Sequence, residues 1–132
     1  MNENERNTYR LLRGWRRLGV KKQFFESRCD FSPAQREARL AIINQLLELL
    51  DSSMALLNAD ERYVIQRHLI DGIGWKCIVY EYNTKLWRPV KKSLSSLRRL
   101  QRSGVGKIAI HAEALGIQWD DAILAVLAGF EL

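Results

Sequence analysis

Basic side chains without acidic neighbours are the feature of this sequence with the clearest chemistry. No Asp or Glu occurs between Glu81 and Glu113, yet this stretch holds eight cations: Lys85, Arg88, Lys91, Lys92, Arg98, Arg99, Arg102 and Lys107. Guanidinium and ammonium groups donate hydrogen bonds to phosphate oxygens and to the acceptor edge of guanine. Because charges of one sign along a helix repel one another, we expect a negatively charged partner to lie against them.

A second basic cluster lies near the N-terminus, where Glu3, Glu5 and Glu26 offset it in part. Its members are Arg13, Arg16, Arg17, Lys21 and Lys22. These side chains are either a second set of phosphate contacts or a charged face exposed to solvent. The interleaved acids favour the exposed face.

Residues suited to catalysis or metal binding are few and scattered. The zinc-ligand types are Cys29, His68, Cys77 and His111, and they contain no closely spaced pair such as zinc sites use. Paired acids occur where helices begin, where the helix dipole accounts for them. The sequence shows no glycine-rich phosphate loop and no nucleophile elbow. We therefore expect no enzymatic activity, no cofactor and no metal.

Composition and helical periodicity predict an all-α fold. The chain has 132 residues, of which 47% are hydrophobic and 27% charged, as in folded globular proteins. It has no apolar run long enough to span a membrane and no signal peptide, so we expect a cytoplasmic protein with reduced thiols. The predicted helices cover residues 4–28 with a break at Gly14 or Gly19, then 33–57, 59–71, 75–82 and 86–102, with short helices in the tail at 107–115 and 121–128.

Three regions follow from these elements, within what we expect to be one domain. Residues 1–57 form an N-terminal helical segment, 58–104 a DNA-binding region and 105–132 a helical tail. The 33–57 helix carries enough Leu and Ile to be the spine of the monomer, which we favour, or the seam of a homodimer. Residues 122–127 are apolar on every side, so either the domain or a partner must cover them.

The predicted helix at 86–102 has two faces. One face is an apolar stripe formed by Leu86, Val90, Leu94, Leu97 and Leu100, and the opposite face is basic. The short helix before it makes this a helix-turn-helix arrangement, in which the second helix enters the major groove of DNA. The expected base-reading residues are Arg88, Lys91, Lys92 and Ser95. The expected phosphate contacts are Lys85, Arg98, Arg99, Arg102 and Lys107.

Residues 57–102 resemble region 4 of sigma-70-type factors. The resemblance is carried by Leu57–Ile65, by Gly74–Ile78, and by the later Val90, Leu94 and Leu97 with cations between them. Among such proteins, the chain is most similar to small phage regulators of late transcription, of the ArpU and RinA type. The sequence departs from the pattern at Val79 and Leu97, where such motifs often have Ala, and Pro89 is expected to fix the start of the second helix.

The resemblance implies a phage or mobile-element protein that binds a promoter-like element and contacts RNA polymerase. We therefore expect a sequence-specific regulator of transcription that binds double-stranded DNA. The alternative is a protein-interaction module that inhibits a polymerase, a nuclease or another nucleoprotein enzyme through its basic face. A role in DNA packaging, which also uses small helical DNA-binding domains, is a third interpretation.

Overall fold

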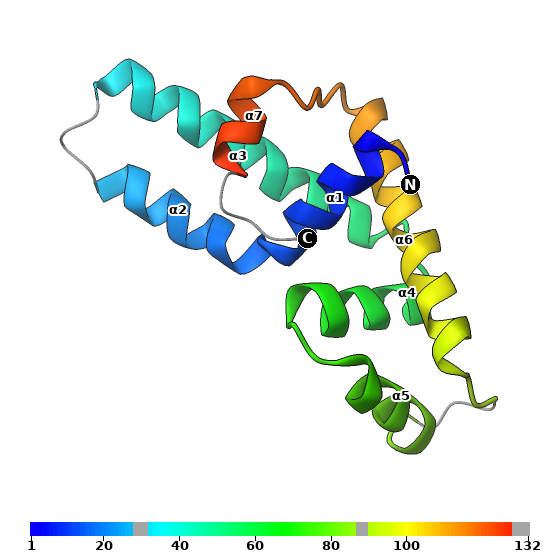
Figure 1. Ribbon diagram of the computed structural model, residues 1–132. Coiled ribbons are helices and arrows are strands. Elements are labelled where there is room, and N and C mark those ends of the chain that lie inside the picture. Colours follow the sequence, from blue (N-terminus) through cyan, green and yellow to red (C-terminus); the bar gives the residue numbers. More distant parts are fainter. Residues whose placement is uncertain (28–31, 87–89, 128–132) are drawn as a thin grey trace.

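Every regular element of the described residues is helical. The computed structural model describes residues 1–27, 32–86 and 90–127, and the all-α prediction is confirmed. Figure 1 shows α6 along one side of the molecule, with α1, α3 and α7 toward its C-terminal end, α4 beside its middle and α5 toward its N-terminal end. The elements are α1 (Glu3–Arg13), α2 (Trp15–Ser27), α3 (Pro33–Met54), α4 (Ala59–Val64), the π-helix η1 (Ile65–Ile70), α5 (Trp75–Thr84), α6 (Leu94–Ala114) and α7 (Asp121–Val126).

Side-chain caps fix the starts of several helices as their sequences predict. Ser32 and Gln35 form a complete capping box at α3, and Asn58 forms another with Glu61 at α4. Asp120 caps α7 by accepting a hydrogen bond from the backbone of Ile123. The break in the first helical segment falls at Gly14, between α1 and α2, and the helix continues through Gly19.

The main hydrophobic core lies around α3. Ile43, Leu46, Leu49 and Leu50 are fully buried there, and α3 packs on α2, α6 and α7. These residues are covered within the chain, which supports the spine interpretation of this helix. Among the described residues, no helix is long and apolar enough to cross a bilayer.

One face of the apolar tail is covered by the domain itself. Ile123, Val126 and Leu127 are buried in the main core, where α7 packs on α3. Trp119, just before α7, donates its indole N–H to Oδ1 of Asn4 in α1 at 2.7 Å. These contacts join the tail to the N-terminal helix.

A second, smaller core lies between α4, α5 and the beginning of α6. It is built from Val64, Ile78, Tyr82 and Leu97, all nearly or completely buried. Leu86 and Leu100 pack against its edge, as the apolar stripe predicts. Val90 does not, and its side chain is 66% exposed. This small core turns the first half of α6 so that its leucines face inward and its cations outward.

The predicted helix at 86–102 is wrong at both ends. α6 begins at Leu94, because Ser93 adopts an extended conformation and its side chain caps the helix. The connection from α5 therefore spans residues 85–93 instead of a short turn, and Pro89, expected to start the helix, lies outside the described residues. α6 also continues to Ala114, through the boundary expected between residues 104 and 105.

Gly104 lies inside α6 for a packing reason. A Cβ atom at this position would clash with Cδ1 of Ile65, so the glycine lets α6 pass close to η1. The helix predicted to end at residue 102 therefore continues through Gly104. The residues expected to form a separate short helix at 107–115 are the second half of α6.

Candidate nucleic-acid interface

The first half of α6 carries exposed cations on the side away from the small core. Arg98, Arg99 and Arg102 are exposed there, and Lys91 and Lys92 come just before the helix. We refer to these five residues as the α6 basic face. Within residues 1–27, 32–86 and 90–127, none of the five has a carboxylate at ion-pair distance. Their charges are therefore not compensated by ion pairs within these residues.

Asn83 anchors the entry to α6. Its side chain accepts a hydrogen bond from the backbone N–H of Lys92 at 2.8 Å and donates one to the backbone oxygen of Lys92 at 2.9 Å. This double contact fixes the backbone one residue before the Ser93 cap. The helix predicted at 75–82 ends before Asn83, but Asn83 lies inside α5 and holds the following segment in place.

The predicted base-reading residues do not share a helix. Lys91 and Lys92 precede the cap of α6, so they lie on the connecting segment. Ser95 is exposed in the first turn of α6, as predicted. Arg88 and the neighbouring Trp87 fall outside the described residues. The exposed side of the first two turns of α6 therefore presents Ser95 together with Arg98 and Arg99.

An aromatic stack supports the basic face from behind. The rings of His68 and Trp75 lie 4.0 Å apart and nearly parallel, and the Arg98 guanidinium lies 5.9 Å from the centroid of Trp75. Nδ1 of His68 also hydrogen-bonds the side chain of the buried Gln101 in α6. Trp75 packs against the small core, as its apolar stripe predicts. This stack joins η1, α5 and α6 beneath the cations.

Lys107 was predicted to contact phosphate, but its ammonium is already paired within the protein. It lies 2.7 Å from Oε1 of Glu61, a residue only 1% exposed. Ser103 donates to the other carboxylate oxygen at 2.6 Å. Burial would raise the pKa of Glu61, but the hydrogen bonds from Lys107, Ser103 and the Asn58 backbone outweigh it and lower this pKa. Lys107 thus compensates a buried charge.

Lys85, another predicted phosphate contact, is exposed beyond the end of α5. Its charge lies near Glu81, whose pKa is lowered by hydrogen bonds from Tyr63 and Arg67 and, to a smaller extent, by Lys85. The Tyr63 hydroxyl donates to Glu81 at 2.7 Å and Nε of Arg67 lies 3.1 Å from the same oxygen. Among the described residues Lys85 itself has no carboxylate within ion-pair distance.

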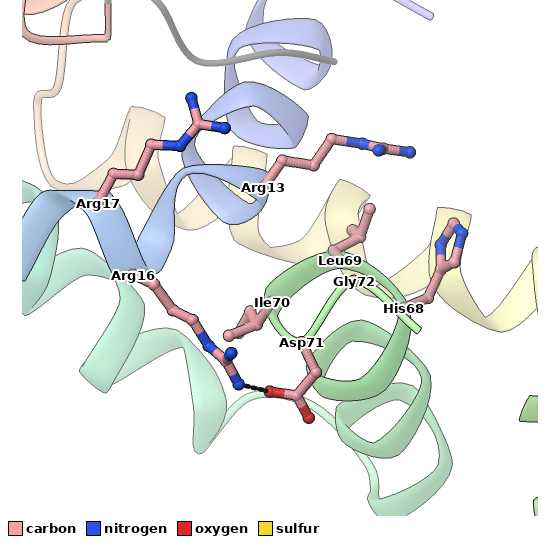
Figure 2. A pocket seen from close by; sticks show the side chains of 8 residues that line it. All are labelled: Arg13, Arg16, Arg17, His68, Leu69, Ile70, Asp71 and Gly72. Atoms are coloured by element: carbon pink, nitrogen blue, oxygen red, sulfur yellow. Dashed lines mark hydrogen bonds and ion pairs between the residues drawn. The ribbon is translucent and has the colours of Figure 1, made fainter. Parts of the chain in front are cut away.

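The structure divides the N-terminal basic cluster. Arg13, Arg16 and Arg17 line one pocket of about 290 Å³ between the α1–α2 corner and the end of η1, shown in Figure 2. We refer to it as the arginine pocket. Lys21 instead donates to the backbone oxygen of Val126 in α7, and burial, with nearby Arg39 and Arg17, lowers its pKa. Lys22 is half-buried and does not line the pocket.

The arginine pocket also contains one acidic side chain. Nη2 of Arg16 lies 2.7 Å from Oδ1 of Asp71, which Figure 2 marks with a dashed line. Asp71 also accepts hydrogen bonds from Gln66 at 3.0 Å and from Arg67 at 3.1 Å. Nothing in the spacing of the sequence pairs Arg16 with a residue 55 positions away.

The described residues of zinc-ligand type have different surroundings. His111 contacts Ser52, His68 contacts Gln101, and Cys77 is exposed on α5. Cys29 lies outside the described residues.

Comparison of the chain with protein-family models, with curated proteins and with solved structures finds no match.

Proposed function

We propose that this protein binds double-stranded DNA through the α6 basic face and regulates transcription from a promoter-like element. The observation that carries the proposal is that the positive charges on this face are not balanced by negative ones. Four of its five cations are exposed and Lys92 is half-buried, and no described carboxylate pairs with any of them. DNA is the polyanion that neutralises such a surface, because it carries a phosphate charge about every 1.7 Å along its axis.

The beginning of α6 is the element we assign to the major groove. Leu97 is fully buried in the small core behind it, while Ser95, Arg98 and Arg99 face outward. In a helix-turn-helix the N-terminal residues of the second helix contact base edges. We therefore assign base reading to these three exposed residues, and phosphate contacts to Lys91, Lys92 and Arg102.

The resemblance to sigma region 4 supports the regulatory part of the proposal. It favours a phage or mobile-element regulator that contacts RNA polymerase. The long connection between α5 and α6 differs from a short helix-turn-helix turn. We propose that the double contact of Asn83 with Lys92 substitutes for the short turn by fixing the second half of this connection.

Fluorescence anisotropy with a labelled random-sequence duplex tests the proposal. The variant Arg98→Gln/Arg99→Gln removes two exposed cations from α6, and Arg6→Gln/Arg39→Gln removes two exposed cations from α1 and α3 as a matched control. We expect the first pair to weaken binding roughly tenfold or more at about 0.1 M salt. The control should bind as the wild type does.

A wild-type protein that binds no duplex at low salt would overturn the proposal. That result would favour the protein-interaction alternative, which needs no affinity for DNA. Selection of bound duplexes from a random pool then tests specificity, because base contacts enrich a sequence and phosphate contacts alone do not.

A further inference from the structure

We propose that Trp75 is a positioning residue for base reading, and that its ring orients the Arg98 guanidinium on the exposed side of α6. This inference rests on the proposed function and names the side chain through which one base contact is set. Trp75 is the first residue of α5 and Arg98 lies in the second turn of α6, so their contact joins the two helices of the proposed helix-turn-helix. The guanidinium carbon of Arg98 lies 5.9 Å from the centroid of the ring, which is within the range of a cation–π contact.

The ring of Trp75 is itself fixed by its neighbours. It stacks on the imidazole of His68, with 4.0 Å between the ring centroids and 28° between the ring planes. Nδ1 of His68 lies 2.5 Å from Oε1 of Gln101, a residue only 8% exposed. The half-buried Trp75 also packs against the small core. A side chain with packing and hydrogen-bonded support of this kind offers the guanidinium a surface of defined position.

These contacts form a path that begins and ends on α6. It runs from Gln101 of α6 to His68 of η1, then to Trp75 of α5, and returns to Arg98, one turn before Gln101 on α6. The connection between α5 and α6 spans residues 85–93 and is longer than the turn of a short helix-turn-helix. The path therefore restrains the beginning of α5 against α6 at a point that the connection does not reach.

The charge state of His68 suits this arrangement. Burial lowers the pKa of His68, the hydrogen bond with Gln101 acts in the opposite direction, and the charges of Arg13 and Arg98 lower it further. A lowered pKa keeps the imidazole neutral near pH 7. A neutral ring stacks on Trp75 without repelling the guanidinium that lies near the same indole.

Arg98 differs in this contact from the other exposed arginines of α6. Among the described residues, no aromatic ring lies against the guanidinium of Arg99 or Arg102. A side chain with free rotamers loses that freedom when it contacts a base, and this loss opposes binding. Arg98 has already lost part of it, and a planar guanidinium held in one orientation matches the two acceptors of guanine. We therefore expect the contact between Trp75 and Arg98 to contribute to sequence preference more than to overall affinity.

A double-mutant cycle on sequence preference tests this assignment. The wild-type protein first selects duplexes from a random pool, and the preference is the ratio of the affinity for a selected duplex to that for random-sequence duplex. Trp75→Leu removes the aromatic face and keeps an apolar side chain against the small core. We expect it to lower the preference roughly threefold to tenfold. Trp75→Phe retains an aromatic face and should keep most of the preference.

The cycle separates positioning from a general loss of stability. Trp75→Leu should have no further effect on the preference when combined with Arg98→Gln, because the guanidinium that it positions is absent. Combined with the matched control Arg99→Gln, it should have the same effect as in the wild type. No loss of preference in Trp75→Leu alone, or the same loss in all three backgrounds, would overturn the inference and leave DNA binding intact.

A measurement on the free wild-type protein keeps the test decisive if Trp75→Leu does not fold. Nitrogen-15 relaxation of the arginine Nε–H groups should give a higher order parameter for Arg98 than for Arg99, because the ring restricts the first guanidinium. Equal order parameters would overturn the positioning role. If the wild type binds duplex but selects no sequence, DNA binding stands and this inference fails. If it binds no duplex at low salt, the proposed function fails and this inference fails with it.

Discussion

The two halves of α6 carry cations of the same sign with different consequences. Arg102, in the first half, is exposed and has no described carboxylate at ion-pair distance, whereas Lys107, in the second half, pairs with the buried Glu61. The first half lies on the small core and the second half is enclosed by the main core. A stretch of sequence without acidic residues can therefore still have an acidic neighbour in the folded protein, because Glu61 of α4 packs against Lys107.

Exchange of one cation in each half is the strongest test of this difference. Lys107→Met should lower the free energy of unfolding by about 1–3 kcal/mol, because the buried Glu61 carboxylate loses a charged partner. Arg102→Met should change it by less than about 0.5 kcal/mol. Urea denaturation followed by circular dichroism measures both values.

Duplex affinity should respond in the opposite order. Arg102→Met should weaken binding to all sequences alike, while folded Lys107→Met should bind as the wild type does. Equal effects of the two substitutions on affinity would show that the two halves of α6 do not differ as described.

Glycines at the junction of the two halves provide the next test. Gly104→Ala should destabilise the protein by about 1–3 kcal/mol, because the new Cβ overpacks the contact with Ile65. Gly106 has no atom within 4 Å of its would-be Cβ. Gly106→Ala should therefore be neutral or stabilise the helix by up to about 1 kcal/mol. If both variants melt at the same temperature, the close approach of α6 to η1 is not required.

Acid should weaken the second half of α6 through Glu61. Because the pKa of Glu61 is lowered in the folded protein, its contribution to stability is complete above its ordinary value of 4.5 and is lost as the pH falls through the folded pKa. Glu61→Gln, which retains a side chain able to close the capping box, should lose part of this dependence. Glu113→Gln, at an exposed residue of α6, is the control. Thermal denaturation between about pH 3 and pH 7 measures the difference.

The anchor before α6 should give the smallest effect. Asn83→Ala removes both hydrogen bonds to the Lys92 backbone, and we expect a loss of duplex affinity of roughly threefold to tenfold, equivalent to about 0.5–1.5 kcal/mol. Thr84→Ala, at an exposed neighbouring residue of α5, is the matched control. Equal affinities of the two variants would contradict a positioning role for Asn83.

Local signals in the sequence predict most of the helices. Capping residues such as Ser32, Asn58 and Asp120 act on their own helices, so their effect can be inferred without tertiary structure. The start of α6 is missed because leucine periodicity extends back to Leu86, whereas the Ser93 cap makes the helix begin at Leu94. The end is missed because Gly104 meets Ile65 only after the chain has folded.

The candidate site is less accessible to sequence analysis for the same reason. The exposed arginines of α6 follow from its periodicity, which is a local property. The pairing of Lys107 with Glu61 and of Arg16 with Asp71 joins residues 46 and 55 positions apart. Such pairs depend on which helices pack together, and the spacing of charges along the chain does not predict that packing.

The salt dependence of duplex binding by the wild-type protein tests the central claim most directly. Contacts from the α6 basic face and Lys85 to about six phosphates predict that log K falls with log salt at a slope of about −5. A slope shallower than about −2, or no measurable binding at about 50 mM salt, would contradict the claim that these cations face a nucleic-acid backbone.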